Sequence, residues 1–511
     1  MSRPLPIVWA LLALMLWHAA AVLSPGSVVF AGPLSILGYM LENAGLLMRA
    51  TAATTLNALW GFVWGNLAAM AMAGLIILVP KAERLTSILA LVVFCLPILA
   101  TGPILRVLSG PGEVPQIALA ALAVYYTTYL SLIVGLRSMP QSWTDLMAIY
   151  GRGAVATLAV VRARASLPYF FVGLQIAAPA AFLGAMIGEF TGAERGLGVL
   201  TLRAMRSMDV EATWSLAMLA ATVAMLGYAL FVWLGRRLVG YVPVIILSPA
   251  ASLAPRPVWR RMAEAIALAL LIVVLWQAIM DVFGLNRFFA KRPGDVWTFM
   301  VSNAQARETL LRALAQTFAT TLPGYGVGLL LGVLLAMLVV LLPKIGAVVV
   351  PVSVALRAVP IITTAPLIVL ALGRGAVGTI TVVAVMIFFP TFLACLQGLR
   401  QTPGQVLDLF RLYQVGRFRQ LFTAQVPAML PAFFAAAKMA VPAAILAVTT
   451  TEWLATGQGV GVLMALTATT SDYNMLWSCI VGITLGATVL YAAVVSLERA
   501  VLRIYASEQV A

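Results

Sequence analysis

Two stretches of this sequence are versions of one another: GLRSMPQSWTDLMAIY at 135–150 and GLRQTPGQVLDLFRLY at 398–413. They lie 398 − 135 = 263 residues apart, and many prolines, glycines, acids and tryptophans match at the same offset. Examples are Pro97 with Pro360, Glu189 with Glu452, and Trp214 with Trp477. Such a fixed offset predicts two homologous halves. We expect a first half at 1–240, a connector at 241–261 and a second half at 262–511.

The composition is that of a membrane protein. Of the 511 residues, 63% are hydrophobic and 10% are charged, whereas about a quarter are charged in soluble domains. A soluble globule keeps a polar surface, so a soluble enzyme is excluded. The formal net charge of +15 comes from basic residues in short loops between apolar segments. That pattern orients membrane proteins, and we expect no binding of nucleic acid.

The sequence contains few groups for catalysis or metal binding. Cys95, Cys395 and Cys479 are scattered through apolar segments, and His18 is the only histidine. Such a set makes neither a disulfide framework nor a metal site. The sequence also contains no G-x-x-x-x-G-K-[ST] loop, so it cannot hold ATP as P-loop proteins do. We therefore expect neither an enzyme nor a resident cofactor.

Apolar segments of about 20 residues indicate membrane-spanning helices. Six occur in the first half, at 6–23, 56–79, 86–108, 117–136, 168–190 and 213–235. Six more occur at 262–283, 320–342, 348–371, 376–397, 430–453 and 475–498. We expect an all-α polytopic membrane protein of about twelve spans in two parallel six-helix repeats. Basic residues in alternate loops place both termini and the connector in the cytoplasm.

The repeated stretch itself predicts an amphipathic helix between spans four and five. Each copy places four apolar residues at i, i+3, i+4 and i+7, on one helical face. They are Trp143, Leu146, Met147 and Tyr150 in the first half, and Val406, Leu409, Phe410 and Tyr413 in the second. Such a helix either rests on lipid headgroups or docks into a groove of a soluble partner. Two copies at matching positions favour docking to a two-fold partner.

In these two stretches the chain resembles the permeases of type I ABC importers. The family signature is a cytoplasmic Glu-Ala-Ala, a glycine six residues after the glutamate, and a later Leu-Pro. Asp145-Leu146-Met147 and Asp408-Leu409-Phe410 stand where Glu-Ala-Ala would be. Gly151 keeps the glycine in the first half, whereas Gln414 replaces it in the second. Within the family, FAKRPGDVW (289–297) and GEFTGAERGLGVL (188–200) resemble nitrate, sulfonate and taurine permeases.

The resemblance implies a fused-dimer permease in the bacterial inner membrane, which forms the solute pathway of an ATP-driven importer. It implies two separate ATPase subunits, coupled through the cytoplasmic helices, and a periplasmic binding protein that delivers a small, possibly anionic solute. The rival interpretation is an ion-coupled secondary transporter of six plus six helices. Such transporters usually carry their longest cytoplasmic loop between spans six and seven, whereas the organised loops here lie between spans four and five.

Three kinds of residue mark a candidate solute pathway or gate. Glu189 and Glu452 end the fifth span of each half, where an acid either lines a gate or is a solvated or capping carboxylate. The glycines that follow predict a re-entrant turn near the outer gate. They are Gly196, Gly198, Gly459 and Gly461. Lys438, inside the fifth span, either attracts an anionic solute or extends toward the cytoplasmic headgroups.

Overall fold

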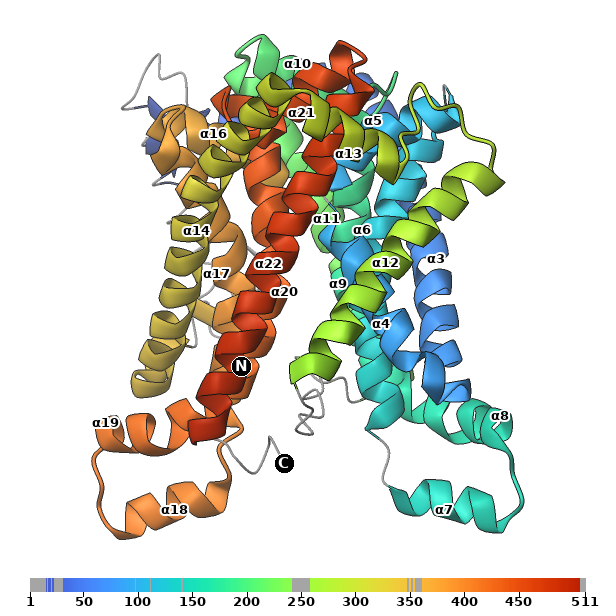
Figure 1. The fold of residues 1–511 in the computed structure, drawn as a ribbon. Coiled ribbons are helices and arrows are strands. Elements are labelled where there is room, and N and C mark those ends of the chain that lie inside the picture. Colours follow the sequence, from blue (N-terminus) through green and yellow to red (C-terminus); the bar gives the residue numbers. More distant parts are fainter. Residues whose placement is uncertain are drawn as a thin grey trace.

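The computed structural model describes residues 31–96, 98–110, 112–138, 141–240, 258–346 and 361–505, together with 15, 17–19, 21–22, 349–350 and 353. Within these residues every regular element is a helix (Figure 1). Eight of the helical segments found there are long and apolar enough to cross a membrane, and two shorter apolar helices accompany them. The chain is an all-α polytopic membrane protein, which confirms the predicted fold class.

The first half has its amphipathic helix α7 at the lower end of Figure 1 and α10 at the upper end. In chain order its elements are α2 (Pro33–Glu42), α3 (Ala44–Leu78), η1 (Pro80–Ala82), α4 (Glu83–Cys95), α5 (Ile98–Ser109), α6 (Val114–Arg137), α7 (Gln141–Ile149), α8 (Ala154–Thr157), η2 (Leu158–Arg162), α9 (Ala163–Phe190), α10 (Leu197–Arg206) and α11 (Val210–Leu238).

The second half repeats this order, with α18 at the lower end and α21 at the upper end. Its elements are α12 (Val258–Val282), α13 (Pro293–Ser302), α14 (Ala304–Leu341), α16 (Ile361–Leu372), α17 (Ala376–Arg400), α18 (Gly404–Leu412), α19 (Arg417–Gln420), η3 (Leu421–Gln425), α20 (Val426–Thr451), η4 (Glu452–Thr456), α21 (Val460–Thr469) and α22 (Tyr473–Tyr505). Both ends of α7 recur in α18 at the sequence offset, since 404 − 141 = 263 and 412 − 149 = 263. The repeat is therefore structural as well as sequential.

The third predicted span of the first half, 86–108, is not one continuous helix. Helix α4 ends at Cys95, and Leu96 is extended with φ −63° and ψ 132°. Leu96 precedes Pro97 in the sequence, and a proline disfavours helical backbone in the residue before it. The prediction of a continuous span was wrong at this point, because the break divides the segment into α4 and α5.

Several predicted spans, and most of the connector, lie partly or wholly outside the residues that the structure describes. The expected first span, 6–23, lies largely outside the described residues, as does the first part of 348–371. Most of the expected connector, 241–261, also lies outside them. Helix α12 already begins at Val258, a few residues before the predicted start of the second half.

The short helix α5 packs across to the second half. Its residue Ile104 belongs to a buried apolar cluster with Val460 of α21 and Leu476 of α22. Leu99 of α5 belongs to a second cluster, against which Leu446 of α20 packs. Helix α16, the counterpart of α5, contacts α11 of the first half. The two halves therefore interlock, and in a membrane such contacts are stabilised by close packing more than by exclusion of water.

Glycines allow the long helices of each half to cross closely. A Cβ atom added to Gly61 of α3 would overlap Ala120 of α6. At the equivalent Gly324 of α14, an added Cβ would lie 2.7 Å from the Cβ of Val383 in α17. Small residues at helix crossings are typical of membrane bundles, and here a glycine lies at the α3–α6 contact and its counterpart lies at the α14–α17 contact.

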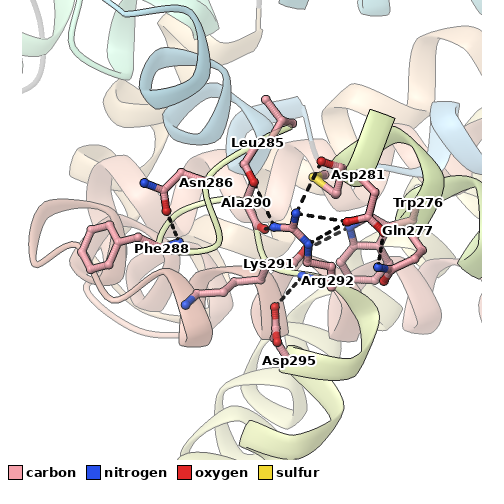
Figure 2. Close-up of polar contacts among 11 residues, drawn as sticks. Trp276, Gln277, Asp281, Leu285, Asn286, Phe288, Ala290, Lys291, Arg292 and Asp295 are labelled. Atoms are coloured by element: carbon pink, nitrogen blue, oxygen red, sulfur yellow. Dashed lines mark hydrogen bonds and ion pairs between the residues drawn. The ribbon is translucent and has the colours of Figure 1, made fainter. Parts of the chain in front are cut away.

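The loop between α12 and α13 is organised around one buried arginine, Arg292 (Figure 2). Its guanidinium donates to one carboxylate oxygen of Asp281 at 3.1 and 3.2 Å. It also donates to the carbonyl oxygens of Leu285 and Ala290, both at 3.0 Å. The backbone N–H of Arg292 donates to Asp295 at 3.0 Å. These bonds fix the end of α12 beside the first turn of α13.

Candidate functional site

The two predicted amphipathic helices project from the lower end of the bundle (Figure 1). Helices α7 and α18 lie beyond α8 and α19, away from the long helices. Trp143 and Leu146 are exposed on α7, as is Tyr150 directly after it, and Val406 and Leu409 are exposed on α18. Tyr413, which directly follows the last residue of α18, is 76% exposed. The structure thus presents most of the predicted apolar face to the surroundings in each copy.

The exposed face is rotated slightly from the one that periodicity predicts. Met147 and Phe410 are half-buried. In contrast, Ile149 and Leu412, which the sequence analysis did not select, are each 81% exposed. These two residues match at the repeat offset, since 412 − 149 = 263, and that match was the available signal. The apolar surface of each helix therefore includes its last residue, beside Tyr150 or Tyr413.

The acids of these helices lie on the surface. Asp145 is exposed, and Asp408 forms a 2.9 Å ion pair with Arg411 in which both side chains are exposed. A surface pair of this kind contributes about 0–1 kcal/mol. The acids therefore mark the polar side of each helix rather than a buried site.

Both helices end in the same left-handed turn. Gly151 has φ +65° and Gln414 has φ +51°. The N–H of Arg152 donates at 2.9 Å to the carbonyl oxygen of Met147, and the second half repeats this bond at the same length. This is the Schellman arrangement that terminates many helices. Gln414 forms the same turn as Gly151, although a residue with a side chain in the left-handed region costs about 1–2 kcal/mol.

At the upper end, each predicted gate glutamate belongs to a buried set of hydrogen bonds that we call a clamp: one glutamate, one threonine and the first N–H groups of the following short helix. Glu189 is 1% exposed, and its two oxygens accept from the Thr54 hydroxyl at 2.7 Å and the Gly198 N–H at 2.6 Å. The Thr54 oxygen in turn accepts from the Leu197 N–H at 2.8 Å. One carboxylate and one hydroxyl thereby satisfy the first N–H groups of α10, which would otherwise be unpaired.

The second half repeats this clamp. Glu452 is 4% exposed and accepts from the Thr317 hydroxyl at 2.8 Å and from the Gly461 N–H at 2.8 Å. The Val460 N–H donates to the Thr317 oxygen at 2.9 Å. Sequence reasoning missed Thr54 and Thr317, although 317 − 54 = 263 shows that they share the repeat offset.

The glycines beside the clamps have backbone geometry that the clamps require. Gly196 has φ +133° and Gly459 has φ +91°. A Cβ atom on either residue would overlap the carboxylate of Glu189 or Glu452. A Cβ atom on Gly198 would lie 2.6 Å from the carbonyl oxygen of Met186. The glycine pairs therefore let α10 and α21 approach the glutamates closely.

A cavity of about 330 Å³ lies between the two halves. Seven pairs of its lining residues match at the 263-residue offset, among them Leu130 with Leu393 and Ile176 with Met439. The lining residues that the structure describes include no charged side chain, and neither the two glutamates nor the four glycines of the clamps are among them. The clamps thus flank this cavity without facing it.

Lys438 lies beside this central cavity rather than in its wall. It lines a smaller cavity of about 20 Å³, and its ammonium group pairs with a carboxylate oxygen of Glu498 at 2.8 Å. Across the described chain, no group of three His, Cys, Asp or Glu side chains is arranged to hold a metal ion.

Comparison with known proteins places the repeat in a family. The model of the family "Binding-protein-dependent transport system inner membrane component" matches residues 61–240 and again 328–503. These two ranges contain α6–α11 and α17–α21 in full, including both amphipathic helices and the glutamates and glycines of both clamps, whereas Thr54 and Thr317 lie before them.

Three relatives are each about half as long as this chain. A Haemophilus influenzae protein named "Probable ABC transporter permease protein" is 29% identical over 238 residues, 46% of this chain and 96% of its own length. A formylaminopyrimidine transport permease of Halalkalibacterium halodurans is 28% identical, over 46% of this chain and 92% of its own length. A riboflavin transport system permease of Chloroflexus aurantiacus is 26% identical, over 45% and 86%. Each relative corresponds in length to one half.

Proposed function

The chain belongs to the family of binding-protein-dependent transport system inner membrane components, and on that premise we propose that it supplies both permease halves of one importer. It is a multi-pass ABC transporter permease of the type I importer class, with the family domain present twice. Proteins of this family are transport components rather than enzymes, and they work with ATPase and solute-binding partners.

In our proposal two ATPase subunits dock on α7 and α18, one on each helix. The observation that carries this proposal is the pair of helices α7 and α18, each with an exposed apolar face. The two helices begin and end at matching positions of the 263-residue repeat, and both end in the same hydrogen-bonded turn. A soluble partner would bury Tyr150 and Tyr413, and aromatic residues are frequent hot spots in such contacts. Because both docks belong to one chain, one permease would bind two ATPases.

The proposed orientation puts the α7 and α18 end in the cytoplasm, with both termini there. The α10 and α21 end then faces the periplasm of a bacterial inner membrane, where a binding protein would deliver a small, possibly anionic solute. Residues 1–240 and 262–511 are the two permease halves, joined by a cytoplasmic connector. Basic residues in the loops at the α7 and α18 end support this orientation.

We propose the central cavity as the solute pathway and the two clamps as anchors of its outer gate. A pathway shared by two related halves lies between them, where the 330 Å³ cavity is lined by matched residues. Because Glu189 and Glu452 fix the starts of α10 and α21, movement of these helices requires that each clamp move with them or open.

Affinity purification of the permease together with its ATPase tests this proposal against the secondary-transporter interpretation. We expect the full-length chain to bind two ATPase copies, and uptake to require ATP hydrolysis. The chain alone should hydrolyse no ATP. Uptake that depends on an ion gradient and continues without any ATPase would contradict the proposal.

A further inference from the structure

The second half carries a largely buried ion pair at a position where the first half has no charged residue. Lys438 of α20 and Glu498 of α22 are 2.8 Å apart, with side chains only 14% and 16% exposed. At the repeat offset their counterparts are Gln175 and Gly235, since 438 − 175 = 263 and 498 − 235 = 263. The first half therefore packs α9 against α11 without this pair.

That internal comparison indicates that the fold does not need the two charges. Burying an ion pair costs desolvation energy that its own attraction often fails to recover. Ionisable residues inside a membrane bundle are expensive, and those that occur generally serve a pathway. The asymmetry between the halves is thus the first reason to assign Lys438 a role in solute selection.

The second reason is the position of Lys438 between the halves. It lines the cavity of about 20 Å³, which shares four lining residues with the central cavity: Phe94, Leu130, Ala435 and Met439. Such a volume holds about one water-sized group. Glu498 is not among the described residues that line either cavity. Of the two residues of the ion pair, Lys438 is therefore the one that borders the cavity.

The surroundings of Lys438 are apolar and aromatic. Phe94 stacks on Tyr126, with ring centroids 4.1 Å apart, and both rings line the small cavity. The only hydroxyl side chains among the described lining of the central cavity are Thr127 and Ser131, both from α6. At the offset their counterparts are Pro390 and Ala394. The polar groups are thus unequally divided between the halves, as suits a solute bound in a single orientation.

We propose that Lys438 selects an organic acid as the solute. The apolar part of the solute would occupy the central cavity, and the acidic group of the solute would bind the Lys438 ammonium group, replacing part of the contact of that group with Glu498. This inference rests on the proposed function, because it takes the central cavity as the solute pathway. It adds the chemical class of the solute and the residue that reads its charge.

Cysteine labelling measures the charge preference directly. Met439 lines both cavities, so Met439→Cys is introduced into the full-length chain in detergent. Its reaction rates are measured with sulfonatoethyl methanethiosulfonate, an anion, and with trimethylammonioethyl methanethiosulfonate, a cation of similar size. Rates of the same chain with Met439 intact are subtracted, which removes any reaction of the native cysteines.

We expect the anion-to-cation rate ratio to fall about tenfold or more in Lys438→Gln with Glu498→Gln, which removes both charges together. Glu498→Gln alone should raise the ratio, because it leaves the ammonium without its counter-ion. Lys438→Arg should keep the original ratio. The first variant has a glutamine at position 438, as the first half has at the equivalent position 175. A glutamine therefore already packs at this point of the fold in the other half of the chain.

A ratio that stays within about twofold across these variants would overturn the proposal. Lack of reaction with either reagent would also overturn it, since a solute of that size could not reach Lys438. Co-purification of the ATPase is measured on the same samples. Its loss in the parent chain would count against the proposed function, whereas a changed rate ratio with normal ATPase binding supports Lys438 independently.

Discussion

Thr54 and Glu189, 135 residues apart in the chain, are joined by a 2.7 Å hydrogen bond from the threonine hydroxyl to a carboxylate oxygen. The same hydroxyl oxygen accepts the N–H of Leu197, so one small side chain connects α3, α9 and α10. Thr317 makes the equivalent bonds in the second half. The outer short helices are therefore held by paired polar contacts rather than by apolar packing alone.

Removing the two hydroxyls should destabilise the protein. In Thr54→Val with Thr317→Val, each site loses a donor to the carboxylate and leaves one backbone N–H unpaired. We expect a cost of about 1–3 kcal/mol per site, seen as a lower midpoint of thermal unfolding in detergent. Thr222→Val is the control, because this exposed hydroxyl bonds only to its own helix at Met218. Equal unfolding midpoints for the clamp and control variants would mean that the clamp hydrogen bonds do not stabilise the fold.

Adding a methyl group to the clamp glycines should be more disruptive. Gly196→Ala and Gly459→Ala each place a side chain in an unfavourable backbone region, at about 1–3 kcal/mol, and also push it into the carboxylate. We expect the double variant to yield little folded protein by fluorescence-detected gel filtration. Gly153→Ala should behave as the parent chain does, since nothing lies within 4 Å of its added Cβ. A well-folded double variant would show that α10 and α21 can move away from the glutamates.

The terminal turns of α7 and α18 allow a reciprocal exchange. Gln414→Gly should stabilise the turn by about 1 kcal/mol, because glycine adopts positive φ without the strain of a side chain. Gly151→Gln should destabilise its turn by a similar amount. Hydrogen exchange of the amides at 152 and 415, which close the two turns, measures both effects. Exchange rates that change in the same direction in both variants would contradict this account.

The exposed ends of the amphipathic helices should carry much of the ATPase contact. Burial of a large apolar side chain contributes about 1.5–3 kcal/mol, so Leu412→Ser with Tyr413→Ser should weaken ATPase binding by at least tenfold to a hundredfold. Ile149→Ser with Tyr150→Ser should do the same for the first half. Membrane insertion should survive, because α7 and α18 are not among the spanning helices.

Quantitative pull-down of the ATPase, normalised to permease expression, measures this loss. Gln405→Ser is the control, an exposed polar position on the same helix α18. Undiminished binding by both double variants would indicate that these helices rest on lipid headgroups instead.

The sequence by itself determined the class of protein, the repeat and the amphipathic helices. Membrane class follows from composition, which needs no knowledge of contacts. Helices α7 and α18 follow from local periodicity and from a repeat that supplies each pattern twice. The interruption at Leu96 also has a local signal in the sequence, the proline that follows it. The prediction missed this signal because the apolar segment continues without a break across the proline.

Only the tertiary structure decided which side chains meet across the bundle. Nothing near Glu189 in the sequence identifies Thr54, and Lys438 is 60 residues from Glu498. In an apolar helix nearly every face can pack against a neighbour, so periodicity does not say which polar residue faces which. The rotated surface of α7, with Ile149 exposed and Met147 half-buried, has the same cause. Local pattern fixes the helices, whereas the close packing of helices distant in sequence fixes the partners of their few polar groups.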